Sequence, residues 1–152
     1  INFNKLYLQK NKMSIEYVYN TTFSLDDEKL VSRWLVKAAK SEGYSIGELV
    51  YAFFDDKDLK NLNNRYLGHD YFTDVISFND SVDNVLNGNI AISIERVLDN
   101  SKKFNVPFQD ELLRVMVHGL LHFMGYDDSS VDEAKVIRKK EDDNLKAFHV
   151  EQ

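Results

Sequence analysis

The sequence predicts a single α+β domain, in which about four strands form a mixed sheet with helices layered against it. Three observations lead to this prediction. The chain has 152 residues, the length of one domain with a proper core. Short strand-like segments are separated by segments whose apolar residues recur at helical spacing. The sequence contains no repeat, low-complexity tract or linker that would divide it.

The first half of the chain predicts two strands and two helices. Residues 15–19 are expected to form a strand, and Ser24 is expected to cap the helix that follows. A second strand is expected over residues 48–54. Residues 56–67 then fit a short helix, which Gly68 closes because glycine favours the left-handed conformation found there.

The second half predicts two more strands and three helices. Residues 74–78 and 89–95 are expected to form strands, separated by a polar loop. Residues 96–104 are expected to continue as a helix. The last helix begins at Ser130, which together with Glu133 forms a capping-box pattern.

A long apolar helix is predicted between the helix over residues 96–104 and the last helix, which begins at Ser130. Pro107 suits its first turn, and Gly125 suits its C-terminal cap. The residues that recur at helical spacing and cover a wide surface are Leu112, Leu113, Met116, Val117, Leu120, Leu121 and Met124. A surface as wide as this predicts that the helix is buried.

Two histidines near the end of this helix predict a metal site. His118 and His122 are four residues apart, so both imidazoles leave the same face of the helix. Asp128 follows past a glycine, where the chain can turn back and offer a carboxylate. Three protein ligands leave a fourth zinc position for water, which is the catalytic arrangement. A His-x-x-x-His pair alone is more often two ordinary side chains, so the prediction depends on the whole motif.

The residue after the first histidine argues against one kind of zinc enzyme. Zinc proteases with the sequence His-Glu-x-x-His place a glutamate there as general base. This chain has Gly119, which has no side chain to accept a proton. The general base therefore stays unassigned.

The whole motif resembles the signature of the YbeY family. It runs from His118 to Asp128 as His-Gly-Leu-Leu-His-Phe-Met-Gly-Tyr-Asp-Asp. Thr-Asp-Val-Ile-Ser-Phe at residues 73–78 and Gly-Asn-Ile-Ala-Ile-Ser at residues 88–93 resemble two family strands. Leu-Asn-x-x-Tyr at residues 62–66 precedes them at family spacing. The resemblance extends from about residue 45 to residue 148.

The resemblance implies a function. The family consists of bacterial, metal-dependent endoribonucleases that act in ribosomal RNA maturation, including the 3′ end of 16S RNA, and in ribosome quality control. It implies cleavage of single-stranded RNA by metal-assisted phosphodiester hydrolysis. It also implies one zinc ion, or another divalent transition metal, on His118, His122 and Asp128. The expected partners are ribosomal RNA and the small ribosomal subunit in the cytoplasm, with neither a membrane nor DNA.

Three positions depart from the family pattern. Asp128 stands where the family usually has histidine, which keeps a zinc ligand but makes the site more negative. Leu67 stands where the family commonly has an arginine implicated in cleavage. Arg65 lies two residues earlier and is a candidate for a phosphate contact. Asn89 replaces an aspartate.

Further residues are candidates for the site. We predict Arg65 and Tyr126 as catalytic residues, and Thr73, Asp74 and His69 as residues that line the substrate cleft. Each also has an ordinary structural interpretation. A histidine in a surface loop, a tyrosine that packs, or a threonine and aspartate that start a strand would need no substrate.

Composition limits these expectations. The net charge is −6, which is unfavourable for nucleic-acid binding. The absence of cysteine excludes disulfides and thiolate ligands. No apolar run approaches the ~20 residues that span a membrane. Two alternatives therefore stay open: a metallohydrolase acting on a peptide or small phosphoester, and a non-catalytic ribosome-assembly factor with a structural metal.

Residues 1–12 look like an extension outside the functional domain. They contain three lysines and no acidic residue, and the sequence begins with Ile1. Met13 is followed directly by the first predicted strand. We therefore expect the domain to comprise residues 13–152.

Overall fold

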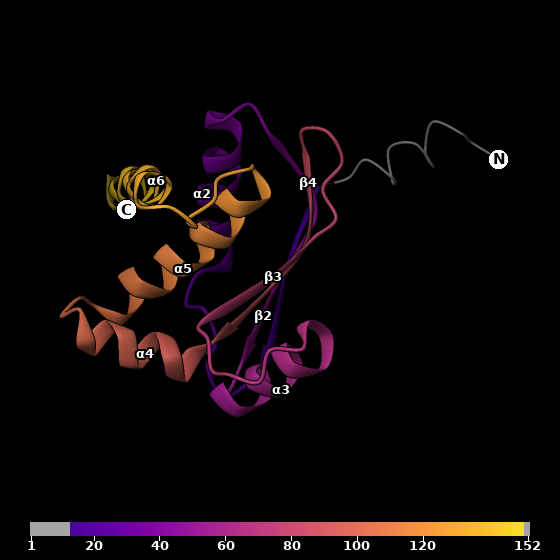
Figure 1. Cartoon of the computed structure of the whole chain (residues 1–152). Coiled ribbons are helices and arrows are strands. Elements are labelled where there is room, and N and C mark those ends of the chain that lie inside the picture. The colour runs from indigo at the N-terminus through magenta and orange to yellow at the C-terminus, as the bar shows by residue number, and fades with distance from the viewer. Residues whose placement is uncertain (1–12, 151–152) are drawn as a thin grey trace.

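A four-stranded sheet runs through the middle of the molecule (Figure 1). The computed structural model describes residues 13–150. The strands β1 (Ser14–Asn20), β2 (Ser45–Phe54), β4 (Val85–Ser93) and β3 (Val75–Asn79) lie side by side in that order. The first three are parallel to one another, and β3 pairs antiparallel with β4 at the edge. The sheet is therefore mixed.

Helices cover the two faces of the sheet unequally. On one face lie α2 (Glu28–Ser41), α4 (Ile94–Lys103), α5 (Phe108–Phe123) and α6 (Val131–Val150), as Figure 1 shows. On the other face lies α3 (Asp56–Leu67). The alternation of side chains along the strands produces this division, since successive residues point to opposite faces. Ile90 and Ile92 join the larger core, and Ala91 packs in the smaller one beneath α3.

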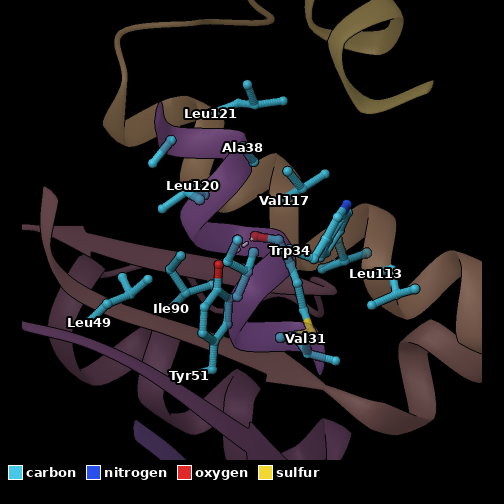
Figure 2. Close-up of a cluster of buried hydrophobic side chains, with 14 of the residues drawn as sticks. Val31, Trp34, Ala38, Leu49, Tyr51, Ile90, Leu113, Val117, Leu120 and Leu121 are labelled. Atoms are coloured by element: carbon cyan, nitrogen blue, oxygen red, sulfur yellow. Dashed lines mark hydrogen bonds between the residues drawn. The ribbon is translucent and has the colours of Figure 1, made fainter. Parts of the chain in front are cut away.

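The helix α5 lies at the centre of the larger core. Its apolar residues face both α2 and the sheet, as Figure 2 shows for Leu113, Val117 and Leu120. The buried hydroxyl of Tyr51 on β2 donates a hydrogen bond of 2.9 Å to the backbone oxygen of Met116. A helix buried on this scale is held in a fixed position, which also fixes the direction of any polar side chain it carries.

The helix α6 closes this layer from outside. Its buried residues include Ile137, Leu145 and Phe148. Trp34 on α2 packs edge-on against Phe148, and its indole nitrogen donates a hydrogen bond of 2.6 Å to the backbone oxygen of Asn144. This contact joins α6 to the core through one of its middle turns.

The predicted fold class is confirmed, and several element boundaries need correction. β2 begins at Ser45 and not at residue 48, and β4 begins at Val85 and not at residue 89, so the predicted polar loop is shorter. Asp27, and not Ser24, caps α2, because its carboxylate accepts a hydrogen bond of 3.0 Å from the backbone nitrogen of Leu30. The strand predicted over residues 89–95 ends at Ser93. The hydroxyl of Ser93 accepts a bond from the backbone nitrogen of Arg96, so the next two residues already belong to α4.

The predicted extension over residues 1–12 lies outside the described residues, and the domain boundary at Met13 stays a prediction. Within residues 13–150, none of the helices combines the length and apolar character that a membrane crossing requires.

Candidate metal centre

Three predicted ligands converge at the C-terminal end of α5. His118 and His122 lie one helical turn apart, and their Nε2 atoms are 3.0 Å from each other. Asp128 comes from the loop between α5 and α6. Its Oδ2 atom lies 3.5 Å from Nε2 of His118 and 3.8 Å from Nε2 of His122. Within residues 13–150, this is the group of side chains placed to share one metal ion.

The other ring nitrogen of each histidine already has a partner. Nδ1 of His122 lies 2.9 Å from the backbone oxygen of Tyr126. A carbonyl oxygen can only accept, so this Nδ1 carries the proton. Nδ1 of His118 lies 2.7 Å from the Oε2 atom of Glu141 and donates to that carboxylate. In the neutral tautomers, both Nε2 atoms therefore present lone pairs to the same point.

This arrangement fits a divalent cation. Two lone pairs that face each other without a hydrogen between them repel, and the oxygen of Asp128 adds a third electron-rich atom. A tetrahedral zinc site with bonds of ~2.0–2.1 Å would place its ligand atoms about 3.3 Å apart. The observed separations of 3.0, 3.5 and 3.8 Å bracket that value. Two imidazoles and one carboxylate are also a donor set that zinc accepts.

Glu141 connects the centre to α6. Its side chain is only 5% exposed, and Oε1 accepts a bond of 3.0 Å from Arg114. The other terminal nitrogen of Arg114 lies 2.7 Å from a carboxylate oxygen of Asp142. A carboxylate that holds the second nitrogen of a metal-binding histidine fixes the ring and makes it a stronger ligand.

The carboxylates around His118 affect its protonation. Burial alone would lower the pKa of His118, but the hydrogen bond to Glu141 and the negative charges of Glu141, Asp128 and Asp74 together raise it. Burial also raises the pKa of Asp74 and of Glu111 above their ordinary values. The carboxylate charges that raise the pKa of His118 also attract a cation.

A cleft of about 350 Å³ opens beside His118. It is lined by His118 and Asp128 and by residues of α4, α5 and α6. Its charged groups beyond the ligands and Glu141 are the carboxyl groups of Asp74 and Glu111 and the guanidinium groups of Arg114 and Arg138. A cleft with carboxyl and guanidinium groups near a metal centre has the components for hydrolysis of an anionic ester.

The structure separates the three predicted cleft residues. Asp74 lines the cleft. The hydroxyl of Thr73 lies 3.4 Å from the backbone oxygen of Val75 and supports the start of β3. His69 is exposed, and its ring stacks on Tyr71 with 5.2 Å between ring centroids. Neither Thr73 nor His69 is among the residues that line the cleft.

Neither of the two predicted catalytic residues lines the cleft. The guanidinium group of Arg65 lies over the ring of Tyr66, 5.4 Å from its centroid. The hydroxyl of Tyr126 donates a bond of 2.8 Å to Glu42, which is also paired with Lys140. It is the backbone oxygen of Tyr126 that faces the site, through His122.

Apart from Asp74, sequence reasoning gave the charged residues of the cleft no role at the site. Glu111 and Arg114 precede His118 by seven and four residues and share its face of α5. Glu141 interrupts the buried stripe formed by Ile137 and Leu145. An acidic residue on an apolar stripe requires a buried partner, and this signal could have identified it.

Comparisons with known proteins agree with this geometry. The family model described as Endoribonuclease YbeY matches residues 14–149. The chain is 48% identical over 138 residues to an endoribonuclease YbeY of Flavobacterium johnsoniae, covering 91% of this chain and 99% of that protein. It is 42% identical over 141 residues to one of Christiangramia forsetii, covering 93% and 99%.

The fold is also similar to that of a Thermotoga maritima protein whose structure was determined in solution. The TM-score is 0.62 at 26% sequence identity, and the match covers 91% of both chains. The family match extends over both histidines, the loop with Asp128 and the helix with Glu141. The chain therefore belongs to the endoribonuclease YbeY family.

Proposed function

We propose that this protein is a zinc-dependent endoribonuclease that cleaves single-stranded RNA during ribosomal RNA maturation in the cytoplasm. His118, His122 and Asp128 hold the ion. The observation that carries the proposal is the convergence of three electron-rich atoms, His118 Nε2, His122 Nε2 and Asp128 Oδ2, in a chain of this family. Ribosomal RNA and the small ribosomal subunit are the proposed substrate and partner.

The bound ion would supply Lewis-acid chemistry, polarising a phosphoryl oxygen and activating a water molecule or the RNA 2′-hydroxyl. The chain supplies the orientation. Glu141 and the backbone oxygen of Tyr126 hold the two imidazoles in the tautomer that leaves Nε2 free. Because both partners are fixed, the ligands need little rearrangement to bind.

Arg138 is the cleft cation best placed to hold the substrate phosphate. Arg114 is largely buried and engaged by two carboxylates, Glu141 and Asp142. The side chain of Arg138 is 60% exposed, and its nearest carboxylate oxygen, on Glu141, is 3.9 Å away. A guanidinium group with free donors can bind a phosphate in bidentate fashion. Arg138 thus offers the cleft a guanidinium group that Leu67 cannot.

Asp74 and Glu111 are the carboxyl groups suited to carry a proton. Both line the cleft, and burial raises the pKa of each. A general acid or base works best when its pKa is close to the working pH. We propose that one of them transfers a proton to or from the reacting oxygen.

Removal of one ligand tests the proposal. His122→Ala should abolish both stoichiometric zinc, measured by mass spectrometry of the metal, and cleavage of a ribosomal RNA fragment. Circular dichroism should show a retained fold. Asp128→Ala should weaken zinc binding, and Asp128→His should retain it because imidazole replaces carboxylate. Undiminished RNA cleavage by His122→Ala would overturn the proposal.

The same preparation separates the alternatives. If zinc only stabilises the fold, EDTA will lower Tm and leave RNA binding intact, and the zinc-loaded protein will cleave no RNA. If the substrate is not RNA, the zinc-loaded protein will hydrolyse casein or a small phosphoester and leave RNA whole.

A further inference from the structure

Exposed aromatic rings gather around the end of α3 and the segment that follows it. Tyr66 is 59% exposed, Tyr71 is 55% exposed and Phe72 is 49% exposed. His69, also exposed, lies between them in sequence. Exposed aromatic rings clustered in one short segment are unfavourable in water and mark a surface that binds something.

Positively charged groups lie over these rings. The ammonium group of Lys60 is 4.6 Å from the centroid of the Phe72 ring, and the guanidinium group of Arg96 is 5.2 Å from it. Arg65 lies over the ring of Tyr66 at 5.4 Å. Lys60 has Asp70 at 3.8 Å, and Arg96 is paired with Asp56 at 2.8 Å. The cations therefore come from α3 and α4 and meet on the aromatic segment.

The rings are held in place before any partner arrives. The rings of His69 and Tyr71 stack nearly parallel, with an angle of 18° between their planes, and the Tyr71 hydroxyl lies 3.0 Å from Nδ1 of His69. The buried side chain of Asn63 donates a bond of 3.3 Å to the backbone oxygen of Tyr71. A ring fixed in this way loses little conformational freedom when another ring stacks on it.

This surface adjoins the metal cleft. Asp74, which lines the cleft, follows Phe72 by two residues. The charges of both His118 in the cleft and Arg96 beside Phe72 act on Asp74 and favour its ionised form. A strand of substrate that lies on the rings can thus continue to the cleft.

We propose that Tyr66, His69, Tyr71 and Phe72, with Lys60, Arg65 and Arg96, form an aromatic platform on which bases of single-stranded RNA stack. This inference rests on the proposed function and names the part of the protein that selects the form of the substrate. Unpaired bases can stack on aromatic side chains in a sequence-tolerant way, whereas bases inside a duplex are not available. Stacking does not depend on a basic surface, so it suits a chain with a net charge of −6.

Binding without cleavage tests the platform. A fluorescent, unstructured oligoribonucleotide of about 12 nucleotides, a length within the range that single-strand binding surfaces cover, is titrated with the full chain in EDTA. Tyr71→Ala should raise Kd about fivefold or more, and the double variant Tyr71→Ala with Phe72→Ala more than about tenfold. The same sequence annealed to its complement should bind weakly to every variant.

Matched variants separate stacking from folding. Tyr71→Phe and Tyr71→Trp keep a ring at this position and should retain the affinity of the wild type. Val136→Ala, which removes exposed apolar surface on α6, should leave Kd unchanged. Zinc content and Tm of the Tyr71 variants should match the wild type, because the platform is separate from the ligands.

Unchanged RNA affinity in both alanine variants would overturn the platform. If those variants keep their RNA affinity but no longer associate with purified small ribosomal subunits, the platform is still overturned. The rings would then be assigned to a contact with protein. The proposed nuclease function fails on a different result, namely no RNA cleavage by the zinc-loaded wild type. Cleavage with unchanged affinities rejects only the platform, and altered affinities without cleavage reject only the nuclease.

Discussion

The carboxylate of Glu141 links one metal ligand to the helix that covers it. Replacing it by glutamine keeps the size and an acceptor oxygen but removes the charge that favours a strongly donating imidazole. We expect Glu141→Gln to lower zinc affinity by about 10- to 100-fold, as is typical for loss of such a partner. Competition with a chromophoric chelator measures this.

Asp142→Asn is the matched control for Glu141→Gln. Asp142 also binds Arg114, but it is half exposed and does not contact His118. The zinc affinity of the Asp142→Asn variant should stay within about threefold of the wild type. The reason is that an exposed ion pair such as that between Asp142 and Arg114 is worth less than about 1 kcal/mol. Equal losses in the two variants would mean that charge near α6, and not the contact with His118, sets the affinity.

A second prediction concerns Tyr126. Its hydroxyl is bonded to Glu42, and its backbone oxygen, which holds His122, does not depend on the side chain. Tyr126→Phe should therefore cost about 1 kcal/mol of stability and leave zinc binding and the RNA cleavage rate within a few fold. Urea unfolding and a cleavage assay measure both. A hundredfold loss of cleavage with zinc still bound would establish Tyr126 as the catalytic residue that the sequence predicts.

Residue types and spacing allowed the ligand set to be proposed in advance. His118 and His122 are separated by one helical turn, so their proximity follows from local geometry alone. Glu141 is 23 residues from His118, and its role depends on how α6 packs. No local rule gives that packing. The sequence therefore predicted the ligands as a set but not the groups that orient them.

At the scale of whole elements, close approach of α5 to the sheet places the histidines. Gly119 makes this approach possible, since a Cβ atom there would lie 3.0 Å from a side-chain carbon of the buried Ile90 on β4. The glycine that excludes a protease-like base thus has a structural use. The strand that Gly119 faces becomes clear only from the fold.

The pairing of β3 with β4 depends on a different glycine. Gly88 has φ = +145°, and a Cβ atom there would lie 2.2 Å from the backbone oxygen of Phe78. We expect Gly88→Ala to lower the free energy of unfolding by about 3 kcal/mol or more, because backbone strain and overpacking add. Asn89→Ala, next to it and exposed, should change it by about 0.5 kcal/mol or less. Urea unfolding of both variants tests this, and similar values for the two would contradict it.

Element boundaries were harder to predict than the elements themselves. The short helix over residues 56–67 matches because its acidic start and closing glycine are local signals. The boundary between β4 and α4 was missed because Ile94 continues the alternation of Ile90 and Ile92, while Ser93 caps the helix. At this point the capping hydrogen bond of Ser93 competes with the strand pattern, and the cap determines where α4 begins.

At the scale of the whole molecule, metal binding couples to pH. The raised pKa of His118 stabilises the metal-free protein at a pH below the ordinary histidine value of about 6.5, and this contribution is lost as the pH rises through the folded value. The raised pKa values of Asp74 and Glu111 act in the same direction at lower pH. Zinc binds only the unprotonated imidazole. As the pH rises, the stabilisation by protonation of His118 is lost, and the stabilisation by bound zinc grows.

The difference in Tm between zinc-loaded and EDTA-treated protein should therefore widen from pH 5.5 to pH 8, that is, from about 1 unit below to about 1.5 units above the ordinary histidine pKa of about 6.5. With free zinc about 100-fold above Kd, we expect a gap of roughly 5–10 °C at the upper end. Thermal unfolding followed by circular dichroism measures it. His122→Ala should show no such gap, and a gap that narrows with rising pH would contradict the assigned ligands.

The contact between Trp34 and α6 has a practical consequence. Trp34 is the single tryptophan of the chain, and its indole nitrogen is bonded to Asn144, three residues beyond Glu141 on the same helix. Any loosening of that helix changes the polarity around the only indole fluorophore. The fluorescence emission maximum of the unmodified protein therefore reports whether α6, the helix that carries Glu141, is packed against the core. It can be followed in real time without a label.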